Sequence, residues 1–508
     1  MIKGLLRLPD LSLVPSRKFA TVVQVVGGYV NISIVIIQGL LLIPVYLHFI
    51  GAHTYGLWLA SGGILGMLGL MNFGISSLLI QRITHAYAQR HLVQVSAYFI
   101  NGAVIYLGIC LLYACVGWLA SIWLPSILKL TGEEAEIIRQ CFQLAVLAMV
   151  IGIFNECLRC LSQALLRPMV PVVSIAIGRI IGIGATVWML FNNYGLWSIP
   201  MGLLISESVI FGVNLISSLA LLWRLKVKFC CDFSIIKEYL KTSPVLLMAR
   251  LGDTLPKESQ PLLITIFLAP ELTTAYMITR RAADIVLQIL NVIVGSTMST
   301  FSHLAGSGDN EKTKIIAVTL LTISFSVGVI GFSVYTGANY EFISLWVGEV
   351  FALDQNVILF IALGFFARTF RGLLAQMLYG LGKFNFPSVV ILMEGVFQIG
   401  LTIWLLSMLG VIGVPLAFLL SCFVAVVVLG LRLKKELVMS FSFIGIFRPF
   451  LSGIVIFGCS ITLMKVWGGV DSWGGFILYL ILLMVGFLMI YVLTNWGKCR
   501  ELYGRIVS

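Results

Sequence analysis

The sequence contains few charged residues. Asp, Glu, Lys and Arg make up only 11% of its 508 residues, whereas 60% are hydrophobic. A soluble globular protein has about 25% charged residues, so this composition excludes that class. It predicts an all-α polytopic membrane protein, because helices satisfy their own backbone hydrogen bonds inside a bilayer. In such a chain the net charge of +12 follows the membrane topology, and we expect no nucleic-acid partner.

The chain also lacks the motifs of ATPases and of common hydrolases. It has no G-x-x-x-x-G-K-[ST] phosphate loop and no H-E-x-x-H zinc site, and its five histidines are scattered. Cys157 and Cys160 form a C-x-x-C pair without a second pair or nearby histidines, which indicates packed thiols. We therefore expect a protein that is not an enzyme, with no catalytic residues, no metal and no cofactor.

Long apolar windows are what the sequence has in abundance. Windows of about 20 residues predict about fourteen transmembrane helices. They lie near residues 21–49, 56–80, 96–122, 140–163, 171–192, 197–222, 244–269, 274–302, 315–338, 356–381, 387–409, 413–431, 449–467 and 474–495. The lysines and arginines between them fall almost entirely in alternate connections, so both termini are expected to be cytoplasmic. External loops are short, and the longest are expected near 123–138 and 339–356.

Part of the chain is repeated. Residues 41–55 share spaced identities with 262–276 at a constant offset, and 171–190 share them with 387–406. These matches predict two six-helix halves in the same orientation, as in transporters built from parallel repeats. The predicted organisation is an N-terminal half (1–223), a basic cytoplasmic linker (224–242), a C-terminal half (243–432), and two appended transmembrane helices with a cytoplasmic tail (433–508).

Charged side chains interrupt the seventh and eighth windows, where they are expensive and indicate a functional site. Arg368 and Arg371 lie one turn apart in the tenth window without an acid three or four residues away. Because guanidinium groups bind phosphate in fork geometry, these residues favour an anionic, phosphate-bearing substrate. The residues expected to bind its diphosphate are Arg250, Lys257, Arg280, Arg281, Arg368 and Arg371. The acids expected to tune these cations or to carry a coupled proton are Asp253, Glu258 and Asp284.

Local ion pairing is the structural alternative. Asp253 and Lys257 are four residues apart, and so are Arg280 and Asp284. Each pair can neutralise itself within one helix and merely hold the bundle together.

Three amides recur at seven-residue steps in the first window: Gln24, Asn31 and Gln38. Since they share one helical face, they are candidates to contact the hydroxyl groups of a sugar. The alternative is that they bond to neighbouring helices.

The opening of the chain resembles a known family. Residues 42–83 combine a proline in the first span, a Gly51…Tyr55-Gly56-Leu57 turn, and Asn72-Phe73-Gly74-Ile75 closing the second span. In these elements the segment is similar to the Wzx-like polysaccharide transporters, the lipid-linked oligosaccharide (O-antigen) flippases. That family belongs to the multidrug/oligosaccharidyl-lipid/polysaccharide (MOP) exporter superfamily, which includes the MATE transporters.

The resemblance implies a MATE-like fold in the bacterial cytoplasmic (inner) membrane. It implies that undecaprenyl-diphosphate-linked oligosaccharide is flipped from the cytoplasmic to the periplasmic leaflet by alternating access, as in lipopolysaccharide synthesis. The implied partners are this lipid-linked oligosaccharide, membrane lipids, a polysaccharide polymerase and a chain-length regulator. Two other functions stay open: a multidrug or small-molecule exporter of the same superfamily, and a membrane-embedded enzyme of glycan assembly. A cationic drug would favour acids over surplus arginine, and a polymerase would show a long basic external loop.

Overall fold

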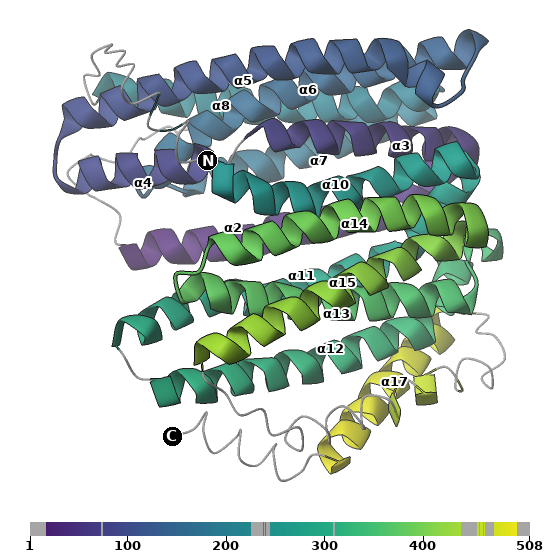
Figure 1. Cartoon of the computed structure of the whole chain (residues 1–508). Coiled ribbons are helices and arrows are strands. Elements are labelled where there is room, and N and C mark those ends of the chain that lie inside the picture. The colour runs from purple at the N-terminus through teal and green to yellow at the C-terminus, as the bar shows by residue number, and fades with distance from the viewer. Residues whose placement is uncertain are drawn as a thin grey trace. The chain divides into compact units, whose positions relative to one another are not determined.

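The computed structural model describes residues 17–72, 75–224, 244–307, 310–437 and 472–494, with isolated residues between 237 and 239 and between 455 and 462. The regular structure of these residues consists of fourteen α-helices and four short 3-10 helices (Figure 1). Nine helical stretches of the described part are long and apolar enough to cross a membrane, and one of them holds two successive helices. The predicted class, an all-α polytopic membrane protein, is confirmed.

The first of two compact units comprises Met1–Gly51 and Leu68–Leu247. Its elements are α2 (Arg17–Phe49), η1 (Gly69–Asn72), α4 (Ile75–Ala88), α5 (Leu92–Ile127), α6 (Gly132–Ala164), α7 (Met169–Phe191), η2 (Gly195–Trp197) and α8 (Ser198–Arg224). Large apolar side chains lie on the outer faces of these helices, for example Leu111 and Trp188, which are 68% and 62% exposed. Such a surface is stable against lipid but not against water.

The second unit comprises Ala52–Met67 and Met248–Ser508. Its elements are α3 (Ala52–Leu68), α10 (Pro244–Phe267), α11 (Pro270–Ser307), α12 (Asn310–Trp346), η3 (Glu349–Phe351), α13 (Gln355–Gly380), α14 (Asn385–Leu409), η4 (Gly410–Ile412), α15 (Gly413–Leu437) and α17 (Trp473–Thr494). The sequence repeat groups α3 with the first half, but its packing partners lie in the second unit.

The order of helix packing is the same in the two units. In the first, α6 and α7 both pack on α8, and α5 packs on α6. In the second, α13 and α14 both pack on α15, and α12 packs on α13. This agreement is expected from the predicted duplication.

The turn between the fourth and fifth helices of each half is also the same. Leu166 and Gly382 take the left-handed conformation there, with φ of +58° and +77°. The next residue is basic, Arg167 or Lys383, and its N–H donates to the carbonyl five residues earlier, over 2.8 and 2.9 Å. Each turn thereby satisfies a carbonyl that the helix end leaves without an intrahelical partner.

The structure corrects two details of the predicted topology. The second window, 56–80, is not one helix, because η1 interrupts it between α3 and α4. The two loops that were expected to be long are also shorter: α5 and α6 leave only residues 128–131 between them, and α12 continues to Trp346. Hydropathy detects only the apolar part of a helix, whereas its backbone hydrogen bonds continue into the polar membrane interface.

The helix α17 packs on α12 of the second unit (Figure 1). The Tyr479 hydroxyl donates to the carbonyl of Gly337 over 2.9 Å, and Phe476, Leu483 and Phe487 are buried. The predicted span 449–467, the linker 224–242 and the chain start before residue 17 lie largely or wholly outside the described residues.

Candidate functional site

Helix α10 carries charges on one face, and its other face is packed tightly against a neighbour. Gly252 of α10 and Gly395 of α14 lie backbone to backbone, and a Cβ on either would overlap the main chain of the other helix. Pro256 lies inside α10 and removes one backbone donor. This close crossing brings Asp253 of α10 next to the polar face of α13.

A four-charge cluster joins three helices at this crossing. Asp253 Oδ1 accepts from Arg371 Nη2 over 2.5 Å and from Arg368 Nη2 over 3.1 Å, both on α13. Arg371 Nη1 lies 3.3 Å from Glu394 Oε2 on α14. Arg371 is only 4% exposed and Glu394 8%. The Cys422 thiol of α15 donates to Glu394 Oε1 over 3.0 Å, so a fourth helix contacts the cluster.

The sequence offers no acid within one helical turn of Arg368 or Arg371. The structure supplies one from another helix, because Asp253 lies more than one hundred residues away in the chain. The local pair expected between Asp253 and Lys257 is also replaced, because Lys257 Nζ lies 3.3 Å from Glu258 Oε1. Each of these side chains thus has another partner in the described part of the chain.

Arg280 of α11 forms a second, deeply buried centre. Its Nη1 donates to Gln260 Oε1 over 2.8 Å, and its Nε lies 3.2 Å from Asp284 Oδ2. The guanidinium stands over the ring of Phe365, 5.5 Å from its centroid. The predicted pairing of Arg280 with Asp284 is confirmed, and α10, α11 and α13 all contribute to the centre.

The remaining predicted cations differ in exposure. Arg250 is exposed, the Lys257 side chain is 50% exposed, and Arg281 is partly buried. Glu258 lies under α3, where a Cβ added to Gly66 would come within 2.6 Å of its Oε2. All nine of the charged residues predicted for the site lie in the second unit.

Sequence reasoning misses Glu394, Cys422 and Gln260. Glu394 is visible in the sequence as an intramembrane acid, but no basic residue lies within one turn of it to suggest a role. Gln260 carries no charge, and the charged residues of the same helix are more conspicuous in the sequence. Only the contacts between helices reveal these three residues.

The predicted sugar-contacting amides belong to the first unit. Gln24 is exposed, while Asn31 and Gln38 are partly buried on α2. The Asn31 carbonyl accepts from Arg179 Nη1 of α7 over 3.1 Å, whereas its side-chain Oδ1 is buried without a hydrogen-bond partner among the described residues. The amides thus lie on the unit that does not contain the nine charged residues.

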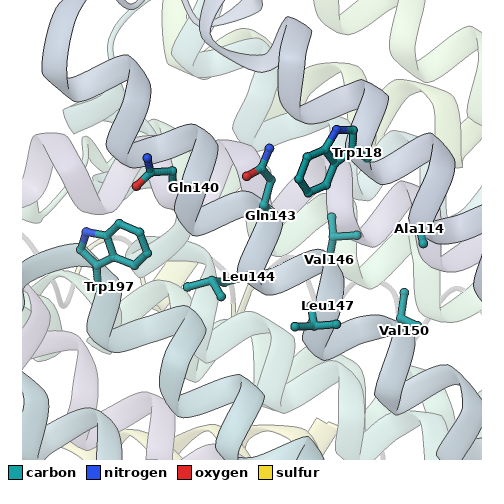
Figure 2. A pocket seen from close by; sticks show the side chains of 9 residues that line it. All are labelled: Ala114, Trp118, Gln140, Gln143, Leu144, Val146, Leu147, Val150 and Trp197. Atoms are coloured by element: carbon teal, nitrogen blue, oxygen red, sulfur yellow. The ribbon is translucent and has the colours of Figure 1, made fainter.

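A cavity with a volume of about 440 Å³ lies in the first unit, between α5, α6 and η2. Figure 2 shows the polar heads of Gln140 and Gln143 with the rings of Trp118 and Trp197, and aliphatic side chains opposite them. None of the predicted site residues lines this cavity. It is an apolar surface groove and does not carry the charge chemistry of the second unit.

The charges of the candidate site do not cancel one another. Six cations are predicted there, and Asp253, Glu258, Asp284 and Glu394 supply four carboxylates. The set therefore has a formal surplus of two positive charges. No group of three or more metal-ligating side chains occurs in the described residues. Surplus guanidinium and ammonium groups suit an anion, and not a cationic ligand.

Comparison with known proteins gives one family and a shared fold. The family model described as "Polysaccharide biosynthesis protein" matches residues 64–335, more than half of the chain. No curated protein matches the sequence.

Several solved membrane transporters resemble the structure. The lipid II flippase MurJ in an inward closed conformation matches with a TM-score of 0.71 and 13% identity, over 94% of this chain and 99% of that one. An inward-facing multidrug resistance MATE family transporter of the MOP superfamily matches with a TM-score of 0.62 and 14% identity, over 79% and 94%. A MOP superfamily transporter from Pyrococcus furiosus, with a binding pocket of reversed polarity, matches with a TM-score of 0.58 and 14% identity, over 84% and 96%. At these identities the likeness shows the fold alone.

Proposed function

Because the chain belongs to the family of polysaccharide biosynthesis proteins and has the fold of MOP superfamily transporters, we propose that it is a flippase for lipid-linked oligosaccharide. Its substrate is undecaprenyl-diphosphate-linked oligosaccharide, such as an O-antigen repeat unit. The protein moves it from the cytoplasmic to the periplasmic leaflet of the bacterial inner membrane by alternating access. It acts as a secondary transporter without catalysis, and both of its termini are cytoplasmic.

The observation that carries this proposal is the formal positive surplus among the named charged residues of α10, α11, α13 and α14. A diphosphate is the charged part of such a substrate, and it needs cations at membrane depth. Arg250, Lys257, Arg281 and Arg368 retain exposed or partly exposed side chains and are proposed to touch the phosphates. Arg280 and Arg371 are almost completely buried. We assign them to the same diphosphate site, where they hold the binding face in position and add to its positive potential.

The acids of the site have a complementary role. Asp253 holds Arg368 and Arg371, and Asp284 holds Arg280. Releasing a guanidinium from such a carboxylate would let it bind phosphate instead, and a proton on the carboxylate would favour that release. Asp253, Glu258 and Asp284 are therefore proposed to tune the cations and to couple substrate binding to proton binding.

The other parts of the substrate need different surroundings. The sugars are proposed to contact Gln24, Asn31 and Gln38, while the polyprenyl tail stays in the bilayer. Membrane lipids are the permanent partners, and a polymerase and a chain-length regulator would receive the flipped unit. The name of MurJ states that it flips lipid II, and the MATE relatives are described as multidrug transporters. Surplus positive charge favours the first of these substrate classes here, because a cationic drug would be repelled.

The proposal is tested by measuring surface polysaccharide in a strain that lacks the gene and expresses each variant in its place. We expect Arg368→Ala to abolish the polysaccharide and Arg368→Lys to restore only part of it, since lysine supplies the charge but not the fork. Lys314→Gln is the matched control, because this cation pairs with Glu311 on α12 and lies outside the site. Membrane levels of each variant are measured by immunoblot. Normal polysaccharide with Arg368→Ala at normal levels would refute the assigned site, and changed drug susceptibility with unchanged polysaccharide on deletion would refute the flippase.

A further inference from the structure

A second cavity lies where α13 turns into α14. It has a volume of about 360 Å³ and contains none of the residues assigned to the diphosphate site. The side chains and main chain that line it belong to Gly382, Lys383, Phe384, Asn385, Phe386 and Arg432. Two of these six residues are cations and two are aromatic.

The two cations are close enough to share one anion. Arg432 Nη2 lies 2.7 Å from Glu436 Oε1, and Lys383 Nζ lies 3.4 Å from Glu436 Oε2. The Glu436 carboxylate thus bridges an ammonium group and a guanidinium with its two oxygens. A phosphate group has the same bridging geometry and offers more acceptor oxygens.

Donors are left over for such a phosphate. An ammonium group has three N–H bonds and a guanidinium five, and Glu436 uses only part of them. The Lys383 side chain is 44% exposed, and Arg432 Nε has no hydrogen-bond partner within the described structure. The first turn of α14 begins here, and its N-cap residue Phe384 supplies no side-chain acceptor. The unpaired N–H groups of a helix N-terminus add positive potential.

Aromatic rings give the cavity an apolar side. Arg432 stands over the ring of Phe386, 5.2 Å from its centroid, and Phe384 stacks on Tyr379. A free phosphate ion would make no favourable contacts with such an apolar surface. An amphiphile with a phosphate next to its acyl chains would contact both sides of the cavity.

The position of the cavity along the helices matches the headgroup layer. The turn joins two apolar helices, and Arg432 lies just beyond the apolar part of a third, α15. Lys434 and Lys435 follow it and are exposed. Residues at the ends of membrane spans lie at the level of the lipid phosphates. The positive-inside rule assigns this end to the cytoplasmic leaflet, where anionic lipids attract basic clusters.

We propose that this cavity is a binding site for the headgroup of an anionic phospholipid. Lys383 and Arg432 bind its phosphate, partly in place of Glu436, and Phe384 and Phe386 contact the start of its acyl chains. The site is separate from the diphosphate site, and it needs only that the chain spans a membrane.

Photo-crosslinking in vesicles tests the proposal. The full-length protein is reconstituted into phosphatidylcholine vesicles that contain a photo-crosslinkable phosphatidylglycerol, and the yield on peptides covering residues 376–390 is measured by mass spectrometry. Each basic residue contributes about a fivefold factor to anionic-lipid binding. We therefore expect Lys383→Gln/Arg432→Gln to lower the yield about 25-fold. Lys314→Gln, a cation paired with Glu311 elsewhere on the second unit, should leave it unchanged.

Two further measurements distinguish a lipid site from a purely structural charge cluster and from a site for free phosphate. Glu436→Gln removes the internal competitor and should raise the yield severalfold, whereas a purely structural role of the three charges would lower it. Excess inorganic phosphate at constant ionic strength should displace little of the lipid. The proposal is overturned if photo-crosslinkable phosphatidylcholine labels the peptide equally, if inorganic phosphate abolishes labelling, or if the double variant labels like the unchanged protein while its melting temperature is preserved.

Discussion

Arg371 and Asp253 are 118 residues apart in the chain, yet Nη2 of the arginine lies 2.5 Å from Oδ1 of the aspartate. Arg371 is 4% exposed. The Asp253 side chain is 39% exposed, so its removal leaves the buried guanidinium with only Glu394, at a cost of up to about 3–5 kcal/mol. The pair is therefore expected to stabilise the crossing of α10 and α13.

A double-mutant cycle measures this coupling. We expect Asp253→Ala and Arg371→Met each to lower the melting temperature in detergent clearly, and the double variant to lose at least about 1 kcal/mol less than the two together. The exposed pair Glu311 and Lys314 serves as the control, with a coupling of at most about 1 kcal/mol. Additive effects at Asp253 and Arg371 would contradict the pairing.

The second prediction concerns the glycines of α3. A Cβ on Gly63 would overlap the main-chain carbonyl of Glu258, whereas a Cβ on its neighbour Gly62 meets nothing within 4 Å. We expect Gly63→Ala to destabilise the protein by about 1–3 kcal/mol, because a backbone atom cannot move away cheaply. Gly62→Ala should be neutral or stabilise by up to about 1 kcal/mol, as alanine does inside a helix. Thermal unfolding of both variants checks this, and equal effects would refute the close packing of α3 on α10.

The third prediction concerns the turn between α13 and α14. Gly382 has φ of +77°, and a Cβ there would meet nothing within 4 Å. Replacement by alanine is therefore expected to cost about 1–2 kcal/mol through backbone strain alone. Gly184→Ala in α7 is the matched control, since that site is equally open but has helical φ. A lower melting temperature for the first variant only is the expected result, and no difference between the two would contradict the left-handed turn.

The fourth prediction concerns pH. Glu271, in the first turn of α11, accepts from its own backbone N–H and lies 2.7 Å from Nδ1 of His53 at the start of α3. These contacts hold the pKa of the Glu271 carboxyl below its usual value of 4.5, the backbone bond contributing most. A lowered folded-state pKa stabilises the protein above the unfolded pKa, and this stabilisation is lost as pH falls through the folded value.

Thermal unfolding as a function of pH tests this sign. The unchanged protein should exceed Glu271→Gln in melting temperature at pH near neutral, and the difference should disappear only at pH values below the usual pKa of a glutamate. His53→Gln should reduce the difference without abolishing it, because the backbone bond remains. A difference that grows as pH falls would show that the carboxyl is not stabilised in its ionised form.

Much of the fold was predictable because hydropathy and charge are properties of each residue. The apolar windows located the helices, and the spaced identities between 171–190 and 387–406 indicated the duplication that the packing order repeats. The break at η1 and the length of α5 and α12 were not predictable in this way. They depend on backbone hydrogen bonds that continue after the apolar signal ends.

The same distinction between predictable and unpredictable features applies to the candidate site. The sequence by itself determined which cations interrupt apolar windows, and it predicted that they lie at membrane depth: Arg250, Lys257, Arg280, Arg281, Arg368 and Arg371. Only the tertiary structure decided their partners: Asp253 holds Arg368 and Arg371, Glu394 lies beside Arg371, and Gln260 binds Arg280. It also decided that α3 packs with the second unit. Acids within one turn of an arginine can be read from the sequence, whereas acidic partners on other helices cannot. Those partners come into contact only because the helices pack closely, as at Gly252 and Gly395, where two backbones touch.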